Sequence, residues 1–411
     1  MGSHSVEIEE HYALLLGIHS PWETSSVDLN MANSRVDIEI EYVDSTGACP
    51  ECGTLCPKHD ERESRTWRHL DTMQFATYLH ARLPRVKCKD HGAKTVSAPW
   101  TTKNSRFTLL FESFAIRVIK ASRSIEEARK LLKLNWHQLE AIKRRAVQRG
   151  LARRQASPIR YLGIDEKQFR SGHRYITNLV DLEQGRVLDV VEERKEASCK
   201  ALLEQALTAE QREQVTAVAL DMWKAFANAV GETMPQASIV HDRFHISQHL
   251  NQAVDQVRRA ENKQLIKEGD SRLKGTKHLW LYNEENVKAA QNEAFSLLKG
   301  SQLKVARSWA IKEHFRPFWD YRSKGWAKRY FEKWYSWAIR CRLEPIKKVA
   351  RMLKAHKDGL LNYFDHRISN AVAEGLNSKI QTVKSNARGY RSFEGFRTSI
   401  LFHCGKLDML P

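Results

Sequence analysis

The sequence predicts a multidomain α/β plus α protein: a small β-rich domain, a helix-turn-helix, an α/β domain and a long all-helical segment. Three observations predict this class. Cysteine and histidine pairs lie in a strand-rich stretch near the N-terminus, a basic segment with helical periodicity follows, and a block of alternating strands and helices then gives way to largely helical sequence. The chain has 411 residues, of which 42% are hydrophobic, so it is long enough for several domains and apolar enough for packed cores.

The charge is strongly positive and unevenly spread. Lys and Arg number 67 against 49 Asp and Glu, which gives a formal charge of +18. Residues 120–160 carry a net charge of +9 and residues 322–357 a net charge of +10, so these two segments account for the surplus. Clustered charge of one sign is typical of a surface that binds nucleic-acid phosphates. No run of about 18 apolar residues occurs and no signal peptide opens the chain, so we expect no membrane association.

Four residues near the N-terminus have the spacing of a zinc site. A CxxC pair followed by Gly and a CxxH pair followed by Gly are separated by strand-like sequence, and together they supply Cys49, Cys52, Cys88 and His91. We therefore expect a zinc ribbon that holds one structural Zn²⁺, since four protein ligands leave no coordination position open for a substrate. Cys56 and His59 are the alternative ligands from the first knuckle, and free thiols without a metal are a further alternative.

The basic segment that follows has the pattern of three helices separated by short turns. Ser124 begins a capping box and Asn135 is a second N-cap, so a helix should start directly after each. We expect the last helix to end at Gly150 and to enter the major groove, as in a helix-turn-helix. A three-helix bundle with a solvated basic face is the alternative. The candidate DNA contacts of this segment are Lys143, Arg144, Arg145, Arg149, Arg153 and Arg154.

The α/β block has the order three strands, helix, strand, helix, strand. Its first strand is expected to end at Asp165, and its fourth strand, an apolar run typical of burial on both faces, at Asp221. If these strands are neighbours, the two carboxylates lie side by side and call for a cation between them. Glu374, on the polar stripe of a later amphipathic helix, could complete a site for Mg²⁺ or Mn²⁺. Asp242 is the alternative for the second carboxylate.

The segment between the α/β block and this last helix is mostly helical and rich in aromatic residues among basic ones. We expect most of these rings to form a helical core. Trp326 lies close to Lys324 and Arg329 in the sequence, and these two cations are further candidate DNA contacts.

Four stretches resemble the motifs of bacterial insertion-sequence transposases of the ISL-three family, which are relatives of the Mutator-like transposases. They are GIDE around Asp165, ALDMWKAF around Asp221, HDRFHI around Asp242 and AVAEGLN around Glu374. The CPECG stretch followed by a basic helix-turn-helix also matches the N-terminal plan of that family, so the resemblance covers nearly the whole chain.

The resemblance implies an RNase H-like catalytic core that is interrupted by a helical insertion before the final Glu. In that family pattern Asp165, Asp221 and Glu374 are the catalytic Asp-Asp-Glu triad and the ligands of two Mg²⁺ (or Mn²⁺) ions. Asp242 and His245 form an Asp-x-x-His signature with a supporting role, and Asn377 is a further supporting residue on the polar stripe of Glu374. The sequence departs from the family at the second zinc knuckle, where His91 stands in place of the more usual Cys.

We therefore expect a DDE-type DNA transposase that binds terminal inverted repeats, cleaves the strand at the transposon end and joins the resulting 3′-OH to target DNA. The expected partners are double-stranded DNA and a second copy of the chain in a synaptic homodimer, and the expected location is the bacterial cytoplasm at the nucleoid. A DNA-binding regulator with a zinc ribbon and helix-turn-helix but no catalysis is one alternative. An RNase H-like nuclease that cuts without joining is another.

The expected domain boundaries follow from these motifs. They are 1–100 for the β-rich domain with the zinc ribbon, 105–155 for the helix-turn-helix, 159–246 for the first part of the RNase H-like core, 247–365 for the helical insertion and 366–411 for the last part of the core.

Overall fold

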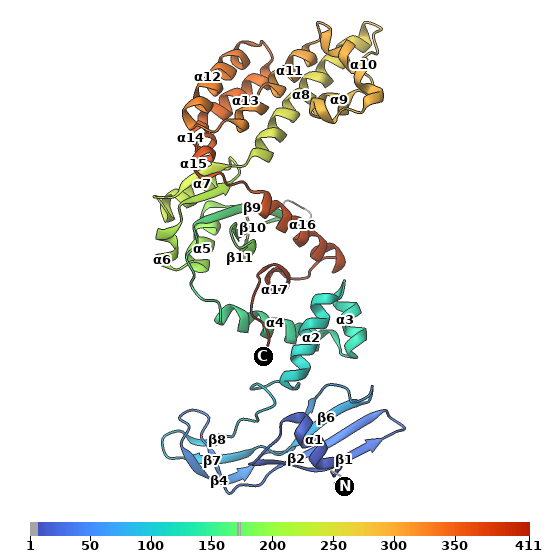
Figure 1. Cartoon of the computed structure of the whole chain (residues 1–411), viewed down its shortest axis with the longest axis vertical. Coiled ribbons are helices and arrows are strands. Elements are labelled where there is room, and N and C mark those ends of the chain that lie inside the picture. Colours follow the sequence, from blue (N-terminus) through green and yellow to red (C-terminus); the bar gives the residue numbers. More distant parts are fainter. Residues whose placement is uncertain (1–6, 171, 173) are drawn as a thin grey trace, which may run out of the picture. The chain divides into compact units, whose positions relative to one another are not determined.

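The computed structural model describes residues 7–170, 172 and 174–411 (Figure 1). The chain forms two compact units. The first consists of Met1–Arg154 together with Leu407–Pro411, and the second of Gln155–Lys406. Within the described residues, no helix is both long and apolar enough to cross a bilayer.

The first unit begins with helix α1 (Ile8–Leu16) and two four-stranded sheets. The first sheet has the order β1-β2-β6-β5, and the second has the order β3-β4-β7-β8. Strand β2 shows why these residues form strands, because its apolar Val36, Ile38 and Ile40 alternate with polar residues and are buried. The strand bounds are Trp22–Asn30, Arg35–Tyr42, Thr46–Ala48, Leu55–Glu61, Arg65–Arg68, Ala76–Ala81, Pro84–Cys88 and Gly92–Thr95 for β1 to β8.

Three helices follow, α2 (Leu109–Ala121), α3 (Ile125–Leu132) and α4 (Trp136–Ala152). The N-caps of the last two are the predicted ones. Ser124 accepts from the amide of Glu127, and Asn135 forms a full capping box with Gln138. The expectation that α4 ends at Gly150 is wrong.

Gly150 lies inside α4 because the C-terminal residues of the chain pack closely against it. A Cβ at this position would lie 2.6 Å from Cβ of Leu407 and 3.2 Å from the carbonyl oxygen of Asp408. The glycine therefore permits the close approach of another segment and does not stop the helix. The sequence gives no local signal for this contact, since the packed segment is far away along the chain.

The second unit contains a five-stranded sheet with the order β11-β10-β9-β12-β13. Strands β9, β10 and β11 are antiparallel, whereas β12 is parallel to both β9 and β13. The first strand (β9) and the fourth strand (β12) of the block are thus neighbours, which is the condition for Asp165 and Asp221 to lie side by side. The bounds of β9 to β13 are Tyr161–Arg170, Arg174–Asp181, Arg186–Glu192, Ala217–Leu220 and Ser238–His241.

Helices cover both faces of this sheet (Figure 1). On β9, Leu162 and Ile164 share a hydrophobic cluster with residues of α5 (Glu196–Ala206) and α7 (Lys224–Thr233). The intervening residue, Gly163, faces the opposite side, where a Cβ would meet Asn370 and Ala373 beside the start of α16 (Ala371–Asn386). The remaining helices of this domain are α6 (Ala209–Gln214) and α17 (Phe393–Cys404).

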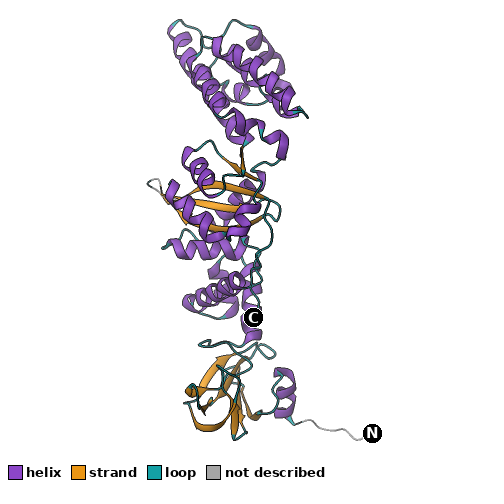
Figure 2. Ribbon diagram, turned by 90° about the vertical axis from the view of Figure 1, so that its left-hand side faces the viewer, coloured by secondary structure: helices purple, strands orange, loops and turns teal. Residues whose placement is uncertain are grey.

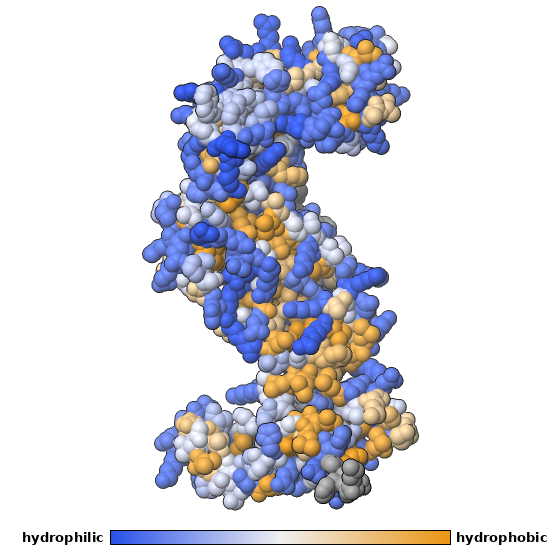
Figure 3. Space-filling view, in the orientation of Figure 1, coloured by the Kyte–Doolittle hydropathy of each residue, from blue (hydrophilic) through white to orange (hydrophobic). Residues whose placement is uncertain are grey.

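The part of the second unit between β13 and α16 contains no strand among its described residues, as Figure 2 also shows. Its core is a separate apolar cluster that includes most of the aromatic rings of the segment. The surface over α12 and α13 is mostly hydrophilic (Figure 3). The helices α8 to α15 span Arg243–Lys267, Lys277–Leu281, Ala289–Gly300, Lys304–Glu313, Lys324–Arg340, Glu344–Ala355, Lys357–Leu361 and Tyr363–His366, with 3-10 turns at Glu284–Asn286 and Arg316–Asp320.

Candidate functional site

The two predicted aspartates lie next to each other on neighbouring strands. Leu220, the last residue of β12, is in register with Ile164 of β9, so Asp221 and Asp165 follow at the same level. The expectation that the first strand ends at Asp165 is wrong, because β9 keeps pairing with β10 as far as Arg170. Asp165 is therefore inside the strand and only 7% exposed, whereas Asp221 stands just beyond the end of β12.

Two asparagines hold the Asp165 carboxylate. Asn377 of α16 donates from its amide nitrogen to Oδ2 of Asp165, and Asn178 of β10 donates to Oδ1 of Asn377 at 2.7 Å. Both asparagines are buried. The sequence pattern did not single out Asn178, although a lone Asn within the buried strand β10 (Arg174–Asp181) is a signal that could have identified it. The pair connects the sheet to α16, which carries Glu374.

Burial and nearby carboxylates raise the pKa values of Asp165 and Glu374. Burial is the main cause that raises the pKa of Asp165 to about 6, and the charges of Asp242 and Asp221 act in the same direction. Burial is also the main cause that raises the pKa of Glu374. The charge of the Asp242 carboxyl, which faces Glu374, raises this pKa further. Neighbouring carboxylates behave in this way when no cation balances them.

Asp242 and His245 complete the cluster from the start of α8. Asp242 is the N-cap of that helix and is buried, and its Oδ2 accepts no hydrogen bond from the N–H and O–H groups of the described residues. Nδ1 of His245 lies 3.7 Å from Oδ2 of Asp221, and Nε2 lies 3.8 Å from Oδ2 of Asp242. The histidine therefore bridges the two aspartates.

The donor set of this cluster fits a hard divalent cation. It consists of carboxylate oxygens, one of them buried without a hydrogen-bond donor, and these are the ligands that Mg²⁺ and Mn²⁺ prefer. The cluster is looser than a closed metal cage. Among the described residues, the one group of three or more ligand atoms that all lie within 4.8 Å of one another is the cysteine and histidine group of the first unit.

That group consists of the four predicted zinc ligands, Cys49, Cys52, Cys88 and His91. Sγ of Cys52 and Sγ of Cys88 are 3.8 Å apart, and Nδ1 of His91 lies 3.6 Å from Sγ of Cys88. A tetrahedral zinc with Zn–S bonds of about 2.3 Å and a Zn–N bond of about 2.0 Å places its ligand atoms ~3.5–3.8 Å apart. The residues present therefore fit Zn²⁺.

The local backbone explains this geometry. Gly53 and Gly92 each follow a pair of ligands and have φ of +73° and +68°, the left-handed turn that brings two ligands to one side. The hydrogen bond with the Thr54 hydroxyl lowers the pKa of Cys52 to about 6, which favours the thiolate that zinc requires. The alternative ligands Cys56 and His59 are not part of the group, and Sγ of Cys56 instead donates to the carbonyl of Thr54.

The basic residues of α4 fall into two classes. The structure departs from the expectation at Lys143, which is 3% exposed and donates to Glu140, so it is not available to a phosphate. Lys143 lies on the buried face of α4, together with Leu139 and Ile142. Arg145 and Arg149 are half-buried and donate to Glu112, which is itself 1% exposed.

Of the remaining candidates in this segment, Arg144 is exposed, Arg153 is exposed and pairs with Asp408 at 3.3 Å, and Arg154 is half-buried. In the second unit Lys324 pairs with Asp365. The guanidinium of Arg329 lies 4.9 Å from the ring centroid of Trp326, which is 60% exposed. This exposed ring with its cation is the arrangement that stacks on nucleic-acid bases.

Comparison with known proteins identifies the family of the chain. A family model described as transposase matches residues 162–400, a zinc-finger model of the transposases IS204/IS1001/IS1096/IS1165 matches residues 45–91, and a model of the helix-turn-helix domain of transposase family ISL3 matches residues 96–147. The first match covers more than half of the chain, and it includes all the carboxylates of the cluster.

Two curated relatives agree with this result. The transposase for insertion sequence element IS1001 of Bordetella parapertussis is 26% identical over 352 residues, which cover 85% of this chain and 86% of that protein. The transposase for insertion sequence element IS1557 of Mycobacterium tuberculosis is 27% identical over 371 residues, which cover 84% of this chain and 82% of that protein. The chain belongs to the ISL3 family of transposases, and it is a DNA transposase with an N-terminal zinc ribbon and helix-turn-helix.

Proposed function

We propose that Asp165, Asp221 and Glu374 are the catalytic Asp-Asp-Glu triad of this transposase. The observation that carries the proposal is the adjacency of β9 and β12, which brings Asp165 and Asp221 together, with Glu374 facing the same cluster from α16. The mixed sheet with helices on both faces supports an RNase H-like core, formed by residues 159–246 and 366–411. The helical segment 247–365 is then an insertion in this core.

The carboxylates would hold two Mg²⁺ or Mn²⁺ ions, which activate the attacking oxygen and stabilise the leaving oxygen of an in-line phosphoryl transfer. The residues of the chain hold this site in place. Asn377 and Asn178 orient the Asp165 carboxylate. His245 orients Asp221 and Asp242, and this matches a supporting role for Asp242.

The first unit supplies DNA binding. Terminal inverted repeats are the proposed ligand of the zinc ribbon and helix-turn-helix, with Zn²⁺ as a structural ion. Arg144 is the exposed cation of α4 that is best placed for a backbone phosphate, and Arg329 is the corresponding candidate in the helical segment. A homodimer that brings two transposon ends together is part of the proposal.

The test is strand cleavage of a duplex that carries an end of the element, with Mg²⁺ in the buffer. Asp221→Asn should lower the cleavage rate by at least 10³-fold. Glu166→Gln is the matched control, because Glu166 adjoins Asp165 in the sequence but pairs with Arg194 at 3.0 Å. The triad assignment fails if Asp221→Asn cleaves at the wild-type rate.

A second substrate separates a transposase from a nuclease of the same fold. A duplex whose end already carries the free 3′-OH, incubated with a circular plasmid, yields a joined product only when the protein catalyses strand transfer. We expect joined product with the wild type and none with Asp221→Asn, because one site serves both displacements. Cleavage without joining would favour the nuclease.

A further inference from the structure

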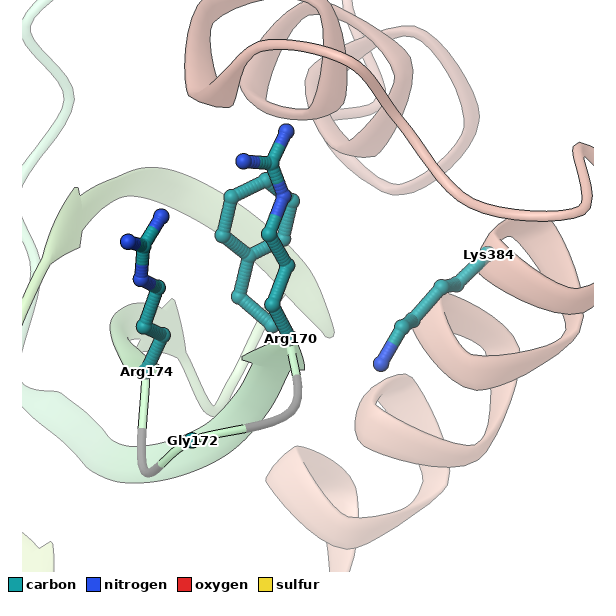
Figure 4. A pocket seen from close by; sticks show the side chains of 5 residues that line it. Arg170, Gly172, Arg174 and Lys384 are labelled. Atoms are coloured by element: carbon teal, nitrogen blue, oxygen red, sulfur yellow. The ribbon is translucent and has the colours of Figure 1, made fainter.

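A basic cavity lies between the β9–β10 hairpin and α16, away from the carboxylate cluster. It has a volume of about 540 Å³ and is lined by Phe169, Arg170, Gly172, Arg174 and Lys384. Figure 4 shows the side chains of Arg170 and Arg174 rising from the hairpin, while Lys384 extends from α16 toward the backbone of the hairpin. The lining includes three cations and no acidic residue, so the cavity favours an anion.

Backbone carbonyls hold two of the three cations, Arg170 and Lys384, and the third, Arg174, also lines the cavity. Arg170 donates to the carbonyls of Tyr390 and Arg391, and Lys384 donates to that of Gln168 at 2.9 Å. Carbonyl contacts position a cation without neutralising its charge. In the described part of the chain no Asp or Glu forms an ion pair with any of the three, so their charges remain available to a ligand.

The pairing of the two arginines adds a second argument. Arg170 and Arg174 are direct partners across the antiparallel strands β9 and β10. Like charges in this position repel each other and destabilise the hairpin. An anion bound between them removes that repulsion. Two guanidinium groups that line one cavity provide several N–H donors, which suit the tetrahedral array of oxygens on a phosphate.

The cavity lies on the same strand and helix as the carboxylates. Asn377 contacts Asp165 near one end of α16, and Lys384 contacts Gln168 near the other, so the helix follows the strand. The strand rises ~16 Å from Asp165 to Arg170, and the helix rises ~15 Å from Glu374 to Lys384. Along B-DNA, with a rise of 3.4 Å per base pair, this distance corresponds to about four to five base pairs.

We propose that this cavity binds a backbone phosphate of the DNA that enters the active site, about four to five base pairs from the bond to be cut. The inference rests on the triad assigned above. A phosphate held here by Arg170, Arg174 and Lys384 is a second fixed point for the DNA. Together with the carboxylate cluster it determines the direction in which the strand crosses the site. The ligand is the phosphodiester of DNA, which is recognised irrespective of base sequence.

The test measures the salt dependence of DNA binding by the full chain. The probe is a fluorescein-labelled 30-base-pair duplex of mixed sequence in EDTA, so binding is measured without cleavage. Each phosphate contact contributes about 0.9 to the slope of log K against log salt concentration. Arg174→Gln combined with Lys384→Gln removes two of the three cations that hold this one phosphate and should therefore reduce the slope by up to about 0.9. Arg174→Gln alone, which removes no hydrogen bond within the described part of the chain, should reduce the slope by a smaller amount, and it keeps the test valid if the double variant does not fold.

The control is Lys263→Gln combined with Lys267→Gln, an equal change in net charge at exposed positions of α8. The inference is overturned if the cavity variants keep the wild-type slope, or if the control variant reduces the slope as much. Cleavage by the wild type, measured in parallel with Mg²⁺, separates the two proposals. An unchanged slope with normal cleavage rejects the phosphate site alone, whereas a changed slope without wild-type cleavage rejects the catalytic assignment alone.

Discussion

Gly163 sets how closely α16 approaches the sheet, and a single methyl group at this position should move the helix that carries Glu374. A Cβ added to Gly163 would lie 2.8 Å from Oδ1 of Asn370, 2.9 Å from Cδ2 of Leu182 and 3.5 Å from Cβ of Ala373. The first two distances are shorter than real van der Waals contacts. Leu182 can rotate away, but Asn370 is fully buried and leads directly into α16.

The expected cost follows from these contacts. Overpacking of this kind destabilises a protein by about 1–3 kcal/mol. The lower entropy of the unfolded chain with Ala offsets about 0.4–1 kcal/mol. Gly163→Ala should therefore lower the free energy of unfolding by roughly 1–2 kcal/mol. Because Glu374 is one helical turn beyond Asn370, its displacement should also slow strand cleavage by about 10²-fold, the usual effect of a shift of about 1 Å in a catalytic group.

Urea unfolding followed by tryptophan fluorescence measures the first quantity, and single-turnover cleavage measures the second. Gly375→Ala is the matched control on the same helix. A Cβ there has no neighbour within 4 Å, so this variant should retain wild-type stability or gain up to about 1 kcal/mol from helix propensity. If Gly163→Ala is as stable and as active as the wild type, the close approach of α16 is not what positions Glu374.

Three further predictions concern other parts of the chain. Metal analysis of the purified protein should give about one zinc per chain. Cys49→Ser combined with Cys88→Ser should lose this zinc, and zinc retained in that variant would reject the ligand set. Glu112→Gln should destabilise the first unit by about 3–5 kcal/mol, because it leaves two arginines without their buried partner. The exposed Glu126→Gln should cost less than about 1 kcal/mol in the same urea assay, and equal effects of the two would contradict the buried network. Burial lowers the pKa of His241 to about 4. As the pH falls, this histidine therefore takes up a proton in the unfolded chain before it does so in the folded protein. The free energy of unfolding should then fall by at most about 3 kcal/mol as the pH drops from about 6.5 to about 4. His241→Gln should flatten this part of the stability profile, and an unchanged profile would exclude His241 as its cause.

Features that depend on a few neighbouring residues could be predicted from the sequence. The N-caps at Ser124 and Asn135 were correct because a cap needs only its own side chain and an amide three residues later. The grouping of Cys49, Cys52, Cys88 and His91 could be predicted for a similar reason, since each knuckle is a local turn. By contrast, Gly150 looked like a helix end because the segment that packs on it is not adjacent in sequence.

The candidate site was only partly predictable. Asp165 and Asp221 could be placed at one level of a sheet once their strands were assumed to be neighbours, and the strand order bears out that assumption. Asn178 could not be assigned as a partner of Asn377, because nothing in the sequence gives the register of β10 against β9 or the face of α16. Lys143 could not be separated from Arg144, since both carry charge and only helix packing determines which one is buried.

The sequence by itself determined the family, the caps of the basic helices and the grouping of the four predicted zinc ligands, because these depend on local spacing and residue chemistry. Only the tertiary structure decided which charges face one another. In the tertiary structure Asp242 faces Glu374, and Lys143 and Glu112 are buried. Arg170, Arg174 and Lys384 line one cavity. The physical reason is that burial and charge pairing depend on contacts between segments far apart along the chain.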